Sequence, residues 1–244
     1  MSFYDIVTEL NLDDIRSRIA GATASDVERA LSREHPTADD FPALFSKAAQ
    51  PYLEEMAQRS AAITERRFGR VIQLYAPIYV SNECVNRCAY CGFSHDLGIP
   101  RVTLTPAQVI QEARFLHDEG FRHLLLVSGE SPRIVNLDYL SEIVSGLNEL
   151  FSAIAIEIQP MHTEEYRKLA EVGVDGLAIY KETYDAVLYK KMHLGGPKRN
   201  FKNRLDSIEC GGEAGFRSLG IGALLGLGEW RLEAVVLAMH GRYL

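Results

Sequence analysis

The hydrophobic and polar residues of the chain follow two different patterns, and the change comes near residue 70. Before it, apolar residues recur at helical spacing behind residues that favour helix starts, as with Thr23 ahead of Val27. A longer amphipathic stretch covers residues 51–68. The pattern therefore predicts a helical extension over residues 1–70, and we expect its last helix to pack around the domain that follows.

From residue 71 to residue 244, short β-branched runs alternate with helical patterns, which is typical of parallel βα units. Thr105 and Thr163 indicate helix starts, and Gly120 and Gly173 indicate helix ends. The expected strands cover residues 71–80, 123–128, 154–159, 176–180 and 218–225. The expected helices cover residues 106–119, 137–150, 163–172, 199–214 and 231–244. This order predicts an α/β fold of the (β/α) barrel type.

The number of expected strands is smaller than a closed barrel needs. A TIM-type barrel has eight parallel strands, and the chain supplies about five of them. Five strands leave the first and the last without a neighbour on one side. We therefore expect a partial barrel, and we interpret the chain as a truncated gene product or a fragment.

Composition and charge narrow the class of protein. The 244 residues are 47% hydrophobic and 24% charged, as in ordinary globular proteins. A net charge of −7 argues against a nucleic-acid or anionic-membrane surface. No apolar run approaches the roughly 20 residues that span a bilayer, and the start lacks an export signal. We expect a cytoplasmic protein that binds neither nucleic acid nor membrane.

Three of the four cysteines, Cys84, Cys88 and Cys91, stand together directly after the first expected strand. Three thiolates can hold three irons of a cubane [4Fe-4S] cluster and leave the fourth iron open. Structural zinc usually has four ligands, but no second Cys-x-x-Cys occurs, and Cys210 is expected to be an ordinary buried thiol. A disulfide is not expected without a secretory signal. The spacing predicts an iron–sulfur site, with zinc or purely structural cysteines as alternatives.

The Cys-x3-Cys-x2-Cys spacing, with Tyr90 before the last cysteine, resembles the signature of the radical S-adenosylmethionine (SAM) enzymes. The resemblance implies that Cys84, Cys88 and Cys91 ligate the cluster. It also implies that SAM chelates the open iron and is cleaved reductively to a 5′-deoxyadenosyl radical. The protein then has to bind, orient and shield this cofactor. Site residues are therefore expected at the carboxyl ends of the barrel strands.

Polar residues occupy two of these strand ends. Ser128, Gly129 and Glu130 follow the second strand and resemble the Gly-Glu element that receives the SAM amine. Glu157 and Gln159 share one face of the third strand by its two-residue period, so both are expected to point into the barrel. The resemblance implies that all five hold SAM. The alternative for Glu157 and Gln159 is a satisfied internal polar pair.

The fifth strand runs into a glycine-rich segment, residues 220–229, that resembles the one lying against adenine in radical SAM barrels. Glycine lets the backbone approach a flat base closely. Leu224 and Tyr90 are accordingly expected to pack near the adenine.

Other polar residues are expected to be structural or solvated. The histidines are scattered without metal-ligand spacing, and His193 is the least certain of them. Charged side chains on solvated surfaces are expected at Lys190, Lys191, Lys198 and Arg199.

Longer segments narrow the resemblance to one branch of the superfamily. Together they resemble the 2-iminoacetate synthases, the tyrosine lyases of thiamine biosynthesis. The segments are YAPIYVSN (75–82), CGF (91–93), LVSGE (126–130), EIQP (157–160), YKETY (180–184) and HLGG (193–196). This resemblance implies cleavage of the Cα–Cβ bond of tyrosine to 2-iminoacetate (dehydroglycine) and p-cresol. It also implies an electron donor such as flavodoxin or ferredoxin, and thiazole synthase as a partner.

One residue departs from the pattern of this branch, because Lys181 stands where the tyrosine lyases usually have glutamine. Glutamine donates and accepts hydrogen bonds, whereas lysine only donates. The change matters if the position contacts SAM or substrate, and has no effect if it faces solvent. The alternatives are a hydrogenase-maturation tyrosine lyase, an inactive truncated remnant and an iron–sulfur module with only a redox role. No residue is assigned to catalysis.

Overall fold

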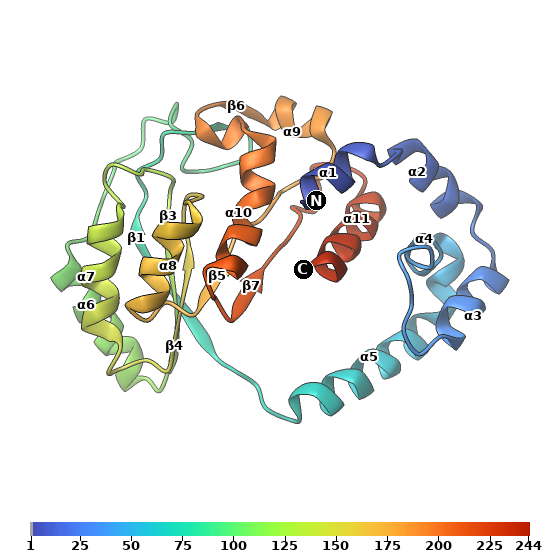
Figure 1. The fold of residues 1–244 in the computed structure, drawn as a ribbon, viewed down its shortest axis with the longest axis horizontal. Coiled ribbons are helices and arrows are strands. Elements are labelled where there is room, and N and C mark those ends of the chain that lie inside the picture. Colours follow the sequence, from blue (N-terminus) through green and yellow to red (C-terminus); the bar gives the residue numbers. More distant parts are fainter. Residues whose placement is uncertain (1) are drawn as a thin grey trace.

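The computed structural model describes residues 2–244 and contains a parallel sheet whose strands follow chain order (Figure 1). The five strands are β1 (Tyr75–Ser81), β3 (His123–Ser128), β4 (Ala153–Glu157), β5 (Gly176–Ala178) and β7 (Ser218–Gly220). The helices that connect them are α6 (Pro106–Asp118), α7 (Leu137–Leu147), α8 (Thr163–Glu171) and α10 (Phe201–Glu213). Strand and helix alternate in every unit, so the prediction of a partial (β/α) barrel is confirmed.

The two faces of the sheet differ in burial because successive side chains of a strand point in opposite directions. Ile78, Leu126 and Ile156 lie in register on neighbouring strands and belong to the main hydrophobic core, which includes residues of α6, α7, α8 and α10. Burying one such side chain contributes roughly 1.5–3 kcal/mol. On the opposite face, Tyr75 and Tyr79 are exposed. The inner face of the partial barrel therefore stays accessible at its strand ends.

The strand boundaries differ from the prediction at the two outer strands of the sheet. Residues 71–74 are exposed and lie outside β1. β7 ends at Gly220, five residues before the predicted end, although Gly222 and Leu224 still form backbone hydrogen bonds with Lys181 and Glu182. A β-branched run such as residues 71–74 predicts extended backbone, but a strand also needs a paired neighbour.

A small second sheet was not predicted. β2 (Arg87–Cys88) pairs antiparallel with β6 (His193–Gly195), and β6 lies between α9 (Ala186–Met192) and the short helix η2 (Pro197–Arg199). Strands of two and three residues are too short for a periodic pattern. This pairing fixes the segment with the cysteines against a segment about a hundred residues later.

The N-terminal region is helical, as predicted, and part of it packs on the end of the chain. Its elements are α1 (Phe3–Glu9), α2 (Leu12–Gly21), α3 (Ala24–Ser32), α4 (Phe41–Leu44), η1 (Lys47–Tyr52) and α5 (Leu53–Phe68). Phe3, Val7 and Ile15 share a core with Leu232 and Val236 of α11 (Trp230–Tyr243). The division at residue 70 stays a prediction, and α1 and α2 are joined to the later part of the chain by this core.

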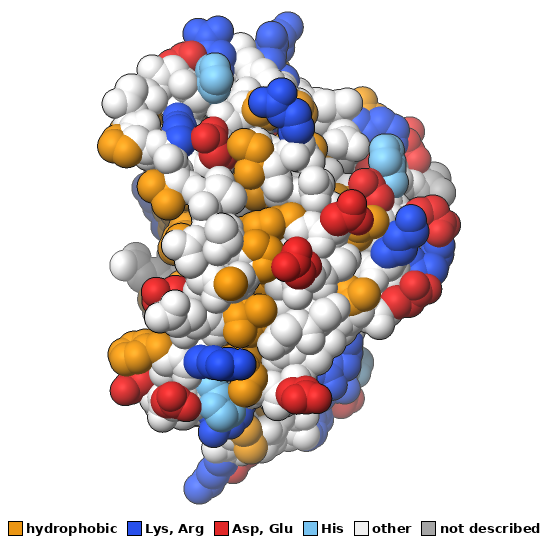
Figure 2. Space-filling view, turned by 90° about the vertical axis from the view of Figure 1, so that its left-hand side faces the viewer, with side chains coloured by type: hydrophobic (Ala, Val, Ile, Leu, Met, Phe, Trp, Pro, Cys, Tyr) orange, Lys and Arg blue, Asp and Glu red, His pale blue; other side chains and the backbone are white. Residues whose placement is uncertain are grey.

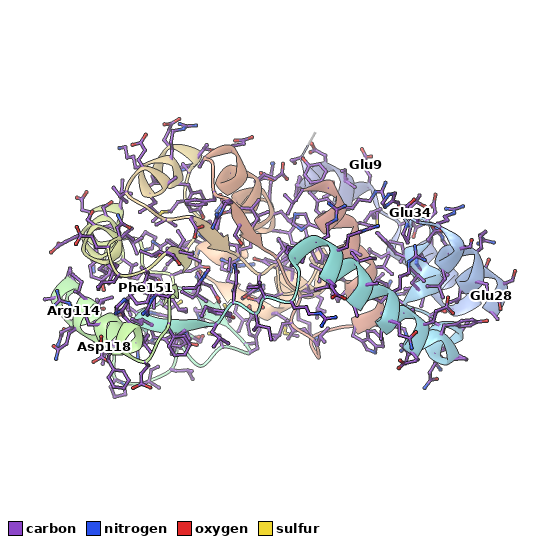
Figure 3. The ribbon with its side chains drawn as sticks, turned by 90° about the horizontal axis from the view of Figure 1, so that it is seen from below. Glu9, Glu28, Glu34, Arg114, Asp118 and Phe151 are labelled. Carbon is purple, nitrogen blue, oxygen red and sulfur yellow. The ribbon has the colours of Figure 1, made fainter. Side chains whose placement is uncertain are left out.

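The expected packing of the helix over residues 51–68 around the barrel is wrong. α5 contacts η1 and buries none of its own residues. Figure 3 places Glu28 of α3 at one end of the molecule and Arg114 and Asp118 of α6 at the other, with α5 on the side of α3. An amphipathic pattern predicts a helix but does not say which surface covers it.

The charges on the surface and the lengths of the helices indicate whether the protein could bind nucleic acid or cross a membrane. Figure 2 views the molecule from the side where α6 and α7 lie in Figure 1, and acidic and basic side chains are intermixed there. This face has no continuous basic surface of the kind that binds nucleic-acid backbones. None of the helices in residues 2–244 combines the length and the apolar character that a bilayer crossing demands.

Candidate functional site

The three clustered cysteines line one cavity of about 210 Å³. Cys84 and Cys88 are buried and Cys91 is partly exposed, and all are free thiols. Cys210 belongs to α10 and does not line this cavity. Of the predicted site residues, the cavity also brings together Tyr90, Ser128, Gly129, Glu130 and Glu157.

The three cysteines line a common cavity. Within residues 2–244, no group of three His, Cys, Asp or Glu side chains is placed to hold a metal ion. A zinc ion would need its ligands to converge within about 2.3 Å, whereas in a cubane cluster each cysteine binds a different iron. Three thiols in one cavity are the donor set that such a cluster needs. Burial raises the pKa of Cys88 to about 11, so a metal has to displace its proton.

Side-chain hydrogen bonds tie the cysteine segment, residues 82–95, to the residues around it. The amide of Asn86 donates to Glu130 Oε2 at 2.6 Å, and its oxygen accepts from Lys198 N at 2.8 Å. Arg101 donates to the carbonyls of Asn82 at 2.6 Å and Ser94 at 2.8 Å. A segment with almost no regular structure is thus fixed by polar contacts. Asn86 and Arg101 were not predicted as site residues.

Gly129 is in close contact with the cysteine segment. Its N–H donates to the carbonyl of Ser81 at 3.0 Å, and a Cβ at this position would lie 2.3 Å from Glu83 O. Only glycine fits such an approach. Beside it, Ser128 has a buried hydroxyl without a hydrogen-bond partner in the described structure, and it lines the cavity. A buried polar atom of this kind calls for a ligand or water.

Two buried ion pairs stand in the cavity wall and were not predicted. Arg204 pairs with Glu130 at 2.6 Å, and Lys198 pairs with Glu182 at 2.8 Å. The side chains of Lys198 and Glu182 are each only 12% exposed, so the expectation that Lys198 is solvated is wrong. Glu182 also has a φ of 74°, a left-handed conformation that is strained for a non-glycine residue and often marks functional sites.

Glu157 lies in the same cavity without a hydrogen bond or ion pair among the described residues. Burial raises the pKa of its carboxyl, and the positive charge of Arg204 opposes this shift. A half-buried carboxylate of this kind can receive a cation or hydroxyl groups.

The structure separates Gln159 from Glu157, so the expectation that both point into one space is wrong. β4 ends at Glu157, and the two-residue alternation does not continue beyond it. Gln159 is 2% exposed, donates to Val135 O at 2.6 Å and lines a smaller cavity of about 50 Å³. Its Oε1 has no partner in the described structure. As a ligand of SAM, Gln159 stays a prediction that this placement does not favour.

Leu224 also lies outside the cysteine cavity. Its N–H donates to Glu182 O at 2.8 Å, and its side chain is 39% exposed. The residue is joined to the cavity wall through the backbone of Glu182, while its proximity to an adenine stays a prediction.

Lys181 faces neither the cysteine cavity nor solvent. Tyr180 and Glu182 line the cavity, whereas Lys181 between them is 2% exposed and donates from Nζ to Phe201 O at 2.7 Å. The nitrogen lies over the rings of Phe201 and Tyr189. Burial lowers the pKa of Lys181 to about 5. Lysine in place of glutamine at position 181 thus affects how side chains pack behind the end of β5.

Tyr90 and His193 join the cysteine segment to β6. The Tyr90 hydroxyl lies 2.8 Å from His193 Nε2, and His193 Nδ1 lies 2.8 Å from Tyr189 O. Burial lowers the pKa of His193 to about 4 and raises the pKa of Tyr90 above its usual range. In the sequence, only the histidine of the HLGG segment pointed to this contact between Tyr90 and His193.

Comparisons with known proteins agree with this arrangement. Residues 78–238 match the protein family described as the Radical SAM superfamily. The chain is 44% identical to the 2-iminoacetate synthase of Escherichia coli (strain K12) and 42% identical to that of Salmonella typhimurium. Each alignment covers 98% of this chain and 64% of the relative, so the chain spans less than two thirds of their length.

Among solved structures, the crystal structure of HydG, a maturase of the [FeFe]-hydrogenase, is similar with a TM-score of 0.86. Its sequence is 29% identical, and the match covers 95% of this chain and 54% of that one. The maturase is thus more distant in sequence than the two synthases.

Proposed function

Because the chain belongs to the radical SAM superfamily, we propose that it forms the SAM-cleaving part of a 2-iminoacetate synthase. Such an enzyme cleaves the Cα–Cβ bond of tyrosine to 2-iminoacetate and p-cresol. The higher identity to the synthases than to the hydrogenase maturase favours this branch. The observation that carries the proposal is the single cavity shared by three thiols, the unpartnered Ser128 hydroxyl and the Glu157 carboxylate.

The residues present fit the cofactors of this superfamily, a [4Fe-4S] cluster and SAM. Cys84, Cys88 and Cys91 would hold three irons. When bound, the reduced cluster supplies the electron that cleaves SAM to a hydrogen-abstracting radical. The protein supplies binding, orientation and exclusion of water.

The charges of the cavity suit SAM. Its wall carries the carboxylates of Glu130, Glu157 and Glu182 and the cations Lys198 and Arg204. Four of these groups form two ion pairs, which leaves Glu157 as the extra negative charge. SAM carries a sulfonium, an ammonium and a carboxylate, so its net charge is positive. A cationic ligand beside Glu157 would favour its ionised form.

A second cavity lies on the same inner face of the sheet. It has a volume of about 400 Å³ and is lined by inward-facing residues that include Tyr75, Leu125 and Ala155. Tyr180 borders both this cavity and the cysteine cavity. The cavity lies toward the amino ends of the strands, where β3 begins at His123 and β7 at Ser218, and its wall also carries Asp175 and Arg217. We therefore assign no part of the substrate to it.

The partners and location of such an enzyme follow from the proposal. The reaction needs a one-electron donor, for which flavodoxin or ferredoxin is suited, and 2-iminoacetate would pass to thiazole synthase. These soluble partners place the enzyme in the cytoplasm.

The test is anaerobic reconstitution of the chain with iron and sulfide, followed by addition of SAM, tyrosine and dithionite. We expect 5′-deoxyadenosine and p-cresol. C88S should lose iron, whereas C210S, which changes the one cysteine outside the cavity, should keep it. Iron without SAM cleavage would favour the redox module, and failure to hold iron would favour the inactive remnant.

A further inference from the structure

We propose that His193 is a positioning residue for the SAM site: it holds the Tyr90 hydroxyl and so fixes the Tyr90 ring in the cavity wall. The inference rests on the proposed function, because SAM is the ligand whose base would meet that ring. Tyr90 lines the cavity directly before Cys91, and its hydroxyl lies 2.8 Å from His193 Nε2.

The direction of this hydrogen bond follows from the other ring nitrogen. His193 Nδ1 lies 2.8 Å from the carbonyl oxygen of Tyr189, which can only accept, so Nδ1 carries a proton. The ring is 0% exposed, and burial disfavours the imidazolium. Nε2 of the neutral ring is therefore an acceptor, and Tyr90 donates to it. The Tyr189 carbonyl thereby selects the tautomer that can receive Tyr90.

The imidazole is itself held rigidly. Its ring centroid lies 3.9 Å from that of Tyr189, and its backbone pairs with Cys88 across the β2–β6 ribbon. A second backbone bond joins Ala89 N to Met192 O at 2.9 Å. The Tyr90 side chain is thus tied to the same ribbon that carries Cys88.

The expected effect is one of preorganisation. Without the bond to His193, the Tyr90 side chain has to be ordered when the ligand binds. Ordering a side chain at a binding site reduces affinity by about two- to tenfold. Iron binding depends on the thiols and should stay unchanged.

Three variants test separately the acceptor on His193 and the donor on Tyr90. H193N keeps a donor near the Nδ1 position and loses the acceptor for Tyr90, whereas H193Q can place an acceptor near the Nε2 position. Y90F keeps the aromatic ring and removes only the hydroxyl. H35N changes an exposed histidine of the N-terminal region and is the matched control.

The measurement is the SAM dissociation constant of each reconstituted protein, followed by the change in the electron paramagnetic resonance spectrum of the reduced cluster. We expect H193N and Y90F each to weaken binding about fivefold, with unchanged iron content. The double variant H193N/Y90F should be no weaker than either single variant, since both remove one bond. H193Q should recover most of the affinity, and H35N should match the wild type.

Additive losses in the double variant, or a Y90F variant with wild-type affinity, would overturn the inference. Y90F leaves the packing of His193 intact, so it decides the question even if H193N does not fold. If the predicted pattern appears but no p-cresol forms, the inference stands and the lyase assignment fails. A wild-type protein that binds iron but not SAM would overturn both proposals.

Discussion

The guanidinium of Arg204 donates a 2.6 Å hydrogen bond to the carboxylate of Glu130, and both side chains are buried at the end of the sheet. The other carboxylate oxygen of Glu130 accepts from Asn86 in the cysteine segment. Glu130 therefore joins α10 to the segment that carries the cysteines. The Ser-Gly-Glu segment thus supports the site as well as bordering it.

Removing one partner of this pair should destabilise the fold strongly. R204M leaves the Glu130 charge buried without its cation, which is expected to lower the free energy of unfolding by about 3–5 kcal/mol. Urea denaturation of the metal-free protein measures this. The double variant E130Q/R204M should recover part of the loss. R217M breaks the exposed Arg217–Asp175 pair and should cost less than about 1 kcal/mol. Equal losses in R204M and R217M would contradict the prediction.

Replacing Lys181 by the glutamine typical of tyrosine lyases should stabilise the chain most at low pH. The folded-state pKa is about 5, and the unfolded value is about 10.4. Between these values the unfolded chain binds a proton that the folded chain does not, so stability rises with pH. The gain from K181Q should shrink by up to about 1.4 kcal/mol per pH unit from about pH 6 to about pH 9.

Urea midpoints of both proteins across this range measure the difference. K191Q, at an exposed lysine of α9, is the control and should change stability by no more than about 0.5 kcal/mol. A constant difference between K181Q and wild type at all pH values would show that Lys181 is charged in the fold.

Gly129 should not tolerate a side chain. The Cβ of G129A would lie 2.3 Å from Glu83 O, a backbone atom of the cysteine segment, so that segment must move. We expect a loss of about 1–3 kcal/mol, as for overpacking, together with reduced iron content after reconstitution. G92A, directly after Cys91, adds its Cβ in open space and should keep its iron. Full iron binding by G129A would contradict the close approach of Gly129 to Glu83.

Replacing Glu157 should affect SAM binding, whereas replacing Gln159 should affect the stability of the fold. E157Q removes the extra negative charge of the cavity and should weaken SAM binding by about tenfold, as for loss of a charged hydrogen bond. Because burial raises the pKa of Glu157, its ionisation destabilises the fold at neutral pH, so E157Q should not be less stable.

Q159A should instead lower stability by about 1–3 kcal/mol, because it leaves the Val135 carbonyl without its donor, and should keep SAM affinity. Equilibrium binding of SAM and urea denaturation separate the two effects. A large loss of SAM affinity in Q159A would restore the expectation drawn from the strand period.

Local signals in the sequence predicted the fold class, and they singled out three cysteines that line one cavity in the structure. The spacing of Cys84, Cys88 and Cys91 and the alternation of strands and helices each depend on neighbours in sequence. Gln159 was misplaced because a two-residue period holds only as long as the strand lasts, and β4 ends at Glu157.

The ion pairs of the cavity could not be predicted in this way. Arg204 and Glu130 are 74 residues apart, and no local pattern distinguishes this arginine from a solvated one. A charged residue such as Lys198 is expected at the surface, because its partner, Glu182, lies 16 residues earlier in an irregular segment. Burial of a charge depends on the whole fold, and a single sequence without its contacts does not report it.

The pairing of β2 with β6 has a consequence for biosynthesis. Tyr90 finds its partner only 103 residues later in the chain, at His193. While the polypeptide leaves the ribosome, the three thiols therefore emerge long before the ribbon that orders them exists. The cysteine segment therefore reaches its folded geometry only after the later segment has been made.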